Sequence, residues 1–155
     1  MALIAQFPAI SGSDELTSPQ HAEFDSLLRK ASLSRSSILN AMVFCLDNAD
    51  SATRVSQILV SWSRGNPDDS VSLETWLSRL YVLSDVLSNA GSGFQSRAWV
   101  YRTEVEPELP EIFYSFGLRL RKAETEEDGK KFRHHVELVL KAWEESSLFA
   151  EDFLR

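Results

Sequence analysis

The sequence predicts an all-α protein, because apolar residues recur at spacings of three and four along most of its length. No run alternates Val, Ile, Thr and Tyr with polar residues as a β-strand does. Consecutive helical segments of similar length indicate antiparallel neighbours stacked into a small superhelix. Glycine and proline, which end helices, are confined almost entirely to Pro8, Gly12, Pro19, Gly65, Pro67, Gly91, Gly93, Pro107, Pro110 and Gly129.

Length and composition favour one folded domain. The 155 residues, 43% hydrophobic and 25% charged, suffice to bury a single core without disulfides or metals. We expect residues 1–17 to form a flexible N-terminal tail and residues 18–155 to form the domain, as a monomer. Cys45 lies in an apolar run and is expected to be a buried thiol, which fits a reducing compartment, cytosol or nucleus.

The first four helices are predicted from their caps and breaks. The first begins near Ser18, with Pro19 in its first turn. The second runs from the cap region at 34–37 to Asn48. The third runs from Ser51 to the Gly65 turn, and the fourth from about Ser72 to Ala90, with Gly91 as its C-cap.

The remaining helices are predicted at about 95–106, 111–122 and 129–146. The Pro107 to Pro110 segment separates the first two of them, and a short final turn is expected at 150–155. Trp62, Trp76 and Trp143 fall on apolar helical faces and are expected in the core.

Charge and motifs argue against several functions. A formal net charge of -7 opposes attraction of the whole domain to nucleic acid or anionic lipid, and no segment is long enough to span a membrane. The histidines lack partners at metal-ligand spacing, and the sequence Gly91-Ser92-Gly93 follows a helix instead of a strand. We expect no catalysis, no metal and no cofactor.

The segment 80–89 contains the best candidate binding surface. On a helix its leucines fall on one side, while the other side carries groups that give directional hydrogen bonds at low entropic cost. These groups form a polar arc: Tyr81, Ser84, Asp85, Ser88 and Asn89.

Basic side chains gather in two places within the acidic chain. Lys131 and His135 share a flank of the last long helix with Leu138, and Arg35 belongs to a second group near the start of the second helix. That flank is expected to border the polar arc. The alternative is that both groups are solvated surface charge.

Residues 81–89, Tyr-Val-Leu-Ser-Asp-Val-Leu-Ser-Asn, resemble the fourth-helix motif Y-L-I-D-S-I-x-K-N of CTD-interaction domains, which recognise the heptad-repeat tail of RNA polymerase II. Residues 139–145, with Leu148 and Phe149, are similar to the last long helix of the family. Residues 41–49 and 80–87 are most similar to the branch found in splicing-associated SURP-motif proteins of the branch-site snRNP.

The resemblance implies a right-handed superhelix of about eight helices, like that of ENTH and VHS domains. It implies a nuclear module in which the second, fourth and seventh helices bind a phosphorylated heptad peptide, coupling transcription to pre-mRNA splicing. Spliceosomal proteins are further expected partners, whereas nucleic acid and membranes are not. The candidate peptide-binding residues are Tyr81, Ser84, Asp85, Ser88, Asn89, Arg35, Lys131, His135 and Leu138.

Two departures from the family pattern keep alternatives open. Ser84-Asp85 stands where most members have Asp-Ser, and Leu138 stands where several phosphate-reading members have arginine. Phosphate would then be met by Lys131, by His135, or by Arg35 with the first N–H groups of the second helix. The alternatives are a splicing scaffold that has lost phosphopeptide reading, and a trafficking adaptor of the ENTH or VHS kind.

Overall fold

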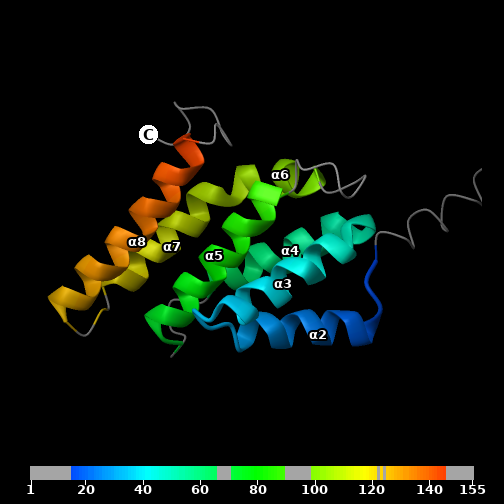
Figure 1. Ribbon diagram of the computed structural model, residues 1–155, viewed down its shortest axis with the longest axis horizontal. Helices are drawn as coiled ribbons and strands as arrows, with labels where there is room; N and C mark the ends of the chain where they lie inside the picture. Colours follow the sequence, from blue (N-terminus) through cyan, green and yellow to red (C-terminus); the bar gives the residue numbers. More distant parts are fainter. Residues whose placement is uncertain (1–14, 66–70, 90–98, 122, 124, 146–155) are drawn as a thin grey trace, which may run out of the picture.

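The computed structural model describes residues 15–65, 71–89, 99–121, 123 and 125–145, and all regular structure in these residues is helical (Figure 1). The all-α prediction is therefore confirmed for the described part of the chain. The number of about eight helices and the right-handed superhelix stay predictions. The elements are α2 (Ser18–Arg29), α3 (Arg35–Asp47), the 3-10 turn η1 (Ala49–Ser51), α4 (Ala52–Arg64), α5 (Leu73–Asn89), α6 (Val100–Val105), the 3-10 turn η2 (Glu106–Glu108), α7 (Leu109–Arg121) and α8 (Glu126–Glu145).

Local sequence explains where the first helices begin. The Thr17 side chain accepts a hydrogen bond from the Gln20 N–H, and the Gln20 side chain accepts one from the Thr17 N–H, so the start of α2 has a capping box. The Ser34 hydroxyl accepts from the Ser37 N–H at 3.2 Å and caps α3. Both starts agree with the sequence-based prediction.

Gly65 ends α4 as predicted, for two physical reasons. Its φ of +60° lies in the left-handed region that favours glycine. A Cβ atom at this position would also come within 2.7 Å of the Trp76 ring. Glycine is therefore required both by the turn and by the packing of α5 against it.

Two predicted boundaries were wrong. The chain stays helical through the expected break, since η2 leads directly into α7, and Pro110 occupies the first turn of α7, where no intrahelical N–H is needed. The last long helix begins at Glu126 instead of 129, because the Thr125 hydroxyl accepts from the Asp128 N–H and acidic residues occupy the first turn. The predicted C-cap at Gly91 and the turn at 150–155 lie outside the described residues.

The third helix begins as predicted, with Ser51 as the N-cap of α4. Residues Ala49–Ser51 form a 3-10 turn, and α4 follows it at Ala52. The preceding Asn48 side chain donates to the Phe44 carbonyl at 2.8 Å and so satisfies the end of α3. The chain thus passes from α3 to α4 through a short helical turn.

The core lies around α4 and α5. Helix α4 packs against α2, α5, α6 and α7, while α5 packs against α3 and α8. Trp76, Trp143 and Cys45 are fully buried, which confirms those predictions, and burial raises the pKa of the Cys45 thiol. Trp62 is only partly buried, because its indole N–H donates to the Asp25 carboxylate at 2.8 Å near the surface.

Arg79 is a buried cation on α5 that joins three helices. Its side chain is only 1% exposed, and its Nε donates to the Leu28 carbonyl near the end of α2 at 3.0 Å. The guanidinium lies 4.9 Å from the centre of the Trp62 ring on α4. Arg79 therefore satisfies a carbonyl near the end of α2 and fixes α5 against α2 and α4.

Arg79, Leu28 and Trp62 form what we call the Arg79 junction, which lies between helices. Helix α5 has a second surface, which carries the polar arc. In Figure 1 this helix lies between α3 and α8, and its contacts with both are extensive. We call the surface that these helices share the three-helix face: α3, the polar arc of α5, and the adjoining flank of α8. Among the described helices, none is both long and apolar enough to cross a membrane.

Candidate functional site

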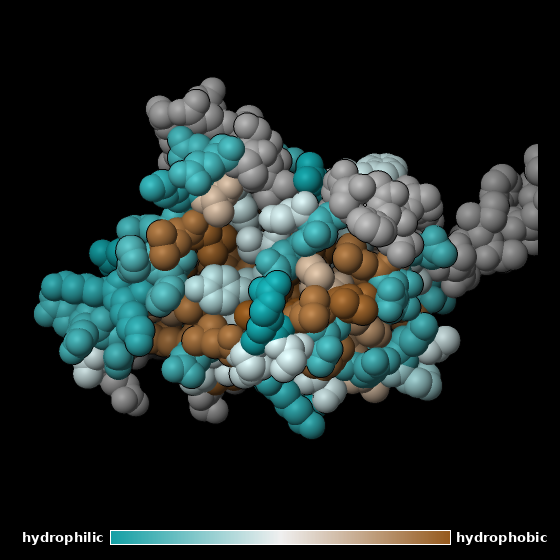
Figure 2. Space-filling view, viewed as in Figure 1, coloured by the Kyte–Doolittle hydropathy of each residue, from teal (hydrophilic) through white to brown (hydrophobic). Residues whose placement is uncertain are grey.

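The three-helix face combines exposed apolar side chains with hydrogen-bonding groups. Leu39 and Val43 on α3 are 42% and 41% exposed, and Leu138 on α8 is 48% exposed. Figure 2 shows hydrophobic surface in separate patches on this side of the molecule, with hydrophilic residues between them. Such mixed surfaces are typical of protein interaction sites.

Tyr81 connects α5 to α8. Its hydroxyl lies 3.2 Å from Nδ1 of His135, and burial raises the pKa of the phenol. The hydroxyl therefore stays protonated at neutral pH and can donate to a neutral imidazole. This contact brings two predicted site residues together from positions 54 residues apart in the sequence.

Ser84 has a structural role that the sequence did not show. Its Oγ accepts a hydrogen bond of 2.9 Å from the indole N–H of Trp143, which is buried. A buried indole N–H needs an acceptor, so Ser84 anchors α8 to α5. The serine hydroxyl can still donate its own proton to a ligand.

Asp85 and Arg35 form the charged part of the three-helix face. Partial burial raises the pKa of the Asp85 carboxyl, and the positive charge of Arg35 acts against that shift. Arg35 is exposed and is the first residue of α3, beside N–H groups of the first helical turn. An anion placed at this point would meet both a guanidinium and a helix N-terminus.

Asn89 and Ser88 lie at the end of α5. The Asn89 amide donates to the Asp85 carbonyl at 2.8 Å, and its nitrogen lies 3.4 Å from the sulfur of Met42 on α3. Its side-chain oxygen is left as the group suited to accept from a ligand. Ser88 is exposed.

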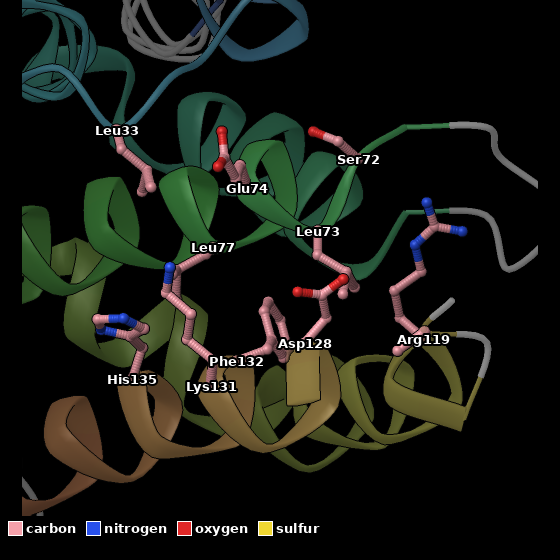
Figure 3. Close-up of a pocket in the computed structure, with 11 residues that line it drawn as sticks. Leu33, Ser72, Leu73, Glu74, Leu77, Arg119, Asp128, Lys131, Phe132 and His135 are labelled. Atoms are coloured by element: carbon pink, nitrogen blue, oxygen red, sulfur yellow. The ribbon is translucent and has the colours of Figure 1, made fainter. Parts of the chain in front are cut away.

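The α8 flank supplies two more predicted residues. Lys131 is exposed, and Leu138 contributes apolar surface without charge. Lys131 and His135 also line a pocket of about 580 Å³, which we call the end pocket (Figure 3). The end pocket lies between the beginnings of α5 and α8 and the end of α7, and is lined by Leu33, Ser72, Leu73, Glu74, Leu77, Arg119, Ala123, Asp128, Lys131, Phe132 and His135.

Sequence reasoning missed two parts of this surface. Leu39 and Val43 are four residues apart, off the face of α3 that buries Ala41, Phe44 and Cys45, and this spacing could have identified them. The end pocket has no comparable signal in the sequence, because its walls come from separate helices.

The chemistry of the site fits non-covalent recognition. Among the described residues, no group of three or more His, Cys, Asp or Glu side chains could hold a metal ion. The three-helix face instead offers a phenol, a carboxylate, an amide and cations beside apolar side chains. These groups suit a peptide with polar and apolar side chains.

Comparison with known proteins identifies the family to which the chain is similar. The model of the CID domain matches residues 22–155. Protein RRC1 of Arabidopsis thaliana is 34% identical over 139 residues, and Protein RRC1-like of the same plant is 32% identical over 139 residues; each match covers 90% of this chain and 14% of the relative. The chain therefore spans about 14% of the length of these relatives.

No solved structure matches the chain. The resemblance to the branch of splicing-associated SURP-motif proteins stays a prediction. The family match covers residues 22–155, which include all of the described helices except the first turn of α2. The chain belongs to the CID domain family, a family of protein-interaction modules.

Proposed function

We propose that this domain, residues 18–155, is a non-catalytic reader that binds the phosphorylated heptad-repeat C-terminal domain of RNA polymerase II on its three-helix face. The CID family is known for interaction with that polymerase tail. The observation that carries the proposal is the contact between Tyr81 and His135, which places the polar arc of α5 beside the α8 flank. A peptide lying on Tyr81 would therefore contact both the polar arc of α5 and the flank of α8.

In the proposed mechanism, different residues of the three-helix face bind the apolar, hydrogen-bonding and phosphate groups of the peptide. Its apolar side chains pack against Leu39, Val43 and Leu138, the exposed apolar residues of α3 and α8. Asp85 and Asn89 accept hydrogen bonds from its hydroxyl or backbone N–H groups. Arg35 meets the phosphate, because its guanidinium and the first-turn N–H groups of α3 lie at one place.

The affinity for one short peptide should be modest. The exposed surface is small, and a disordered peptide loses conformational freedom when it binds. A dissociation constant of about 1–100 μM is expected on this basis. Tandem heptads raise the apparent affinity through effective concentration.

The test is a titration of labelled two-repeat peptides, unmodified or phosphorylated at the second or fifth heptad position. Wild-type protein, Tyr81→Ala and Tyr114→Ala are compared by fluorescence anisotropy, with circular dichroism to verify folding. Tyr114 is the matched control, because it is 67% exposed on α7 and lies outside the three-helix face. Saturable binding of one phosphorylated form, lost in Tyr81→Ala and kept in Tyr114→Ala, is expected.

A scaffold function is the second candidate, and two observations favour it. Leu138 presents apolar surface where several phosphate-reading members of the family have arginine, and the Ser84 oxygen accepts a hydrogen bond from Trp143. Such a scaffold would bind a spliceosomal protein without regard to phosphorylation. Equal binding of phosphorylated and unmodified peptides, or none, together with capture of a defined splicing protein by the same face, would favour this candidate.

A nuclear location and a link between transcription and pre-mRNA splicing belong to the same proposal. They follow from the polymerase tail as partner, since the tail acts in the nucleus. Imaging of the tagged full-length protein tests the location, with Tyr81→Ala as the variant that should lose association with the polymerase while the protein stays folded.

A further inference from the structure

The end pocket extends beyond the polar arc. Its apolar walls are formed by Leu73 and Leu77 from α5 and by Phe132 from α8. Leu77 and Phe132 are each 4% exposed, so the floor of the pocket consists of well-packed core side chains. A pocket of about 580 Å³ is large enough to receive an amino-acid side chain.

Polar side chains of α8 border this floor along its length, and Arg119 of α7 lies at the same end as Asp128. Figure 3 shows His135 and Lys131 at one end, Phe132 in the middle, and Asp128 toward the other end beside Leu73. Glu74 adds a second carboxylate from α5. Within the described residues, Glu74, Asp128 and Lys131 form no ion pair, so these charges are available to a ligand.

The end pocket is continuous with the three-helix face. His135 lines the pocket, and its Nδ1 is also the atom that lies 3.2 Å from the Tyr81 hydroxyl. A chain that lies on Tyr81 and continues past His135 therefore enters the end pocket.

The spacing of Asp128, Lys131 and His135 along α8 indicates how far apart a phosphate and a basic residue should be in a bound peptide. Asp128 precedes Lys131 by three residues and His135 by seven, which corresponds to about 5 Å and 10 Å along the helix axis at about 1.5 Å per residue. An extended peptide covers about 3.3 Å per residue. A phosphate at Lys131 and His135 and a cation at Asp128 would thus be two or three residues apart.

Resting on the proposed function, we propose that the end pocket is a second subsite for the same phosphopeptide. With one phosphate of the two-repeat peptide at Arg35, Lys131 and His135 receive the phosphate of the neighbouring repeat. The floor of Leu77 and Phe132 receives the adjacent apolar residue, and Asp128 selects a basic residue two or three positions from that second phosphoserine. This subsite makes the domain discriminate among heptads that differ in charge beside the phosphate.

The test compares two-repeat peptides, phosphorylated in both repeats, that carry lysine, serine or glutamate two or three residues after the phosphoserine. A second series is substituted two or three residues before it. Affinities are measured at low ionic strength, where exposed ion pairs are least screened. In at least one series, lysine should strengthen binding about two- to five-fold over serine, the size expected for an exposed ion pair, and glutamate should weaken it.

Two variants test whether the preference for lysine depends on Asp128. Asp128→Asn should abolish the preference for lysine. Glu127→Gln is the matched control, because Glu127 is an exposed acid in the same first turn of α8 but does not line the end pocket. It should keep the preference.

The outcomes separate this inference from the proposed function. Equal affinity for the lysine, serine and glutamate peptides, with binding still dependent on Tyr81, would overturn the second subsite alone. A preference for lysine that persists in Asp128→Asn would overturn it as well. Absence of binding to every phosphopeptide would overturn both.

Discussion

The two sides of α5 use polar residues in opposite ways. On one side Arg79 is 1% exposed and is held by the Leu28 carbonyl and the Trp62 ring. On the other side Asp85 is partly exposed, and the charge it feels comes from Arg35, at the exposed start of α3. A fully engaged polar group supports the fold, whereas a partly engaged one can exchange its partner for a ligand.

The largest effect is expected at the Arg79 junction. Arg79→Met keeps most of the side-chain volume but removes the donor to the Leu28 carbonyl, so it should lower the free energy of unfolding by about 2–4 kcal/mol. Urea denaturation measures the change. Arg54→Met is the control, because Arg54 is exposed on α4 and bonds the Gln57 side chain. Equal midpoints for the two variants would contradict this role of Arg79.

A smaller loss of unfolding free energy is expected at Ser84, which belongs to the polar arc but also bonds a buried side chain. Ser84→Ala removes the hydroxyl oxygen that accepts from the buried Trp143 N–H and should cost about 1–2 kcal/mol of unfolding free energy. Ser88→Ala reports the gain of about 0.5 kcal/mol from the helix propensity of alanine, since Ser88 is exposed on the same helix. If Ser84→Ala were as stable as Ser88→Ala, the anchoring bond would be energetically irrelevant.

The smallest expected effect is the pH-dependent contribution of the Asp85 carboxyl to the free energy of unfolding. Its pKa is raised in the folded state by burial, so the ionised carboxylate is less favourable there than in the unfolded chain. This cost is present above the folded pKa and disappears as the pH falls below the unfolded value. Asp85→Asn should therefore be slightly more stable than wild type at neutral pH and indistinguishable in acid.

Thermal unfolding over a pH series, run on both proteins, measures that difference. Arg35→Gln sharpens the test, because loss of the opposing positive charge should raise the pKa of Asp85 further. An advantage of Asp85→Asn that grows in acid would contradict a raised pKa of the Asp85 carboxyl in the folded state.

Sequence periodicity predicted the helices and the two faces of α5, because burial repeats every three to four residues. It also placed Trp76 and Trp143 in the core. It did not predict that Arg79 is buried, since its partners lie at Leu28 and on Trp62 of other helices. Contacts between distant segments are set by packing geometry, which leaves no local signal.

The same limit applies to the candidate site. The polar arc followed from its own spacing, but the bond from Trp143 to Ser84 spans 59 residues and had no signal in either segment. The sequence pattern predicts that the last helix starts at about 129, whereas the cap at Thr125 extends that helix by nearly a turn. This extension is what places Asp128 on a helix facing the end pocket.

The most direct test of the central claim is a titration of the isotopically labelled domain with phosphorylated heptad peptide, followed by amide chemical shifts. We predict that shifts concentrate on the three-helix face, around Val43, Tyr81 and His135, while amides at the Arg79 junction, such as those of Leu28 and Trp62, stay unchanged. Shifts centred on that junction, or none at saturating peptide, would contradict the account.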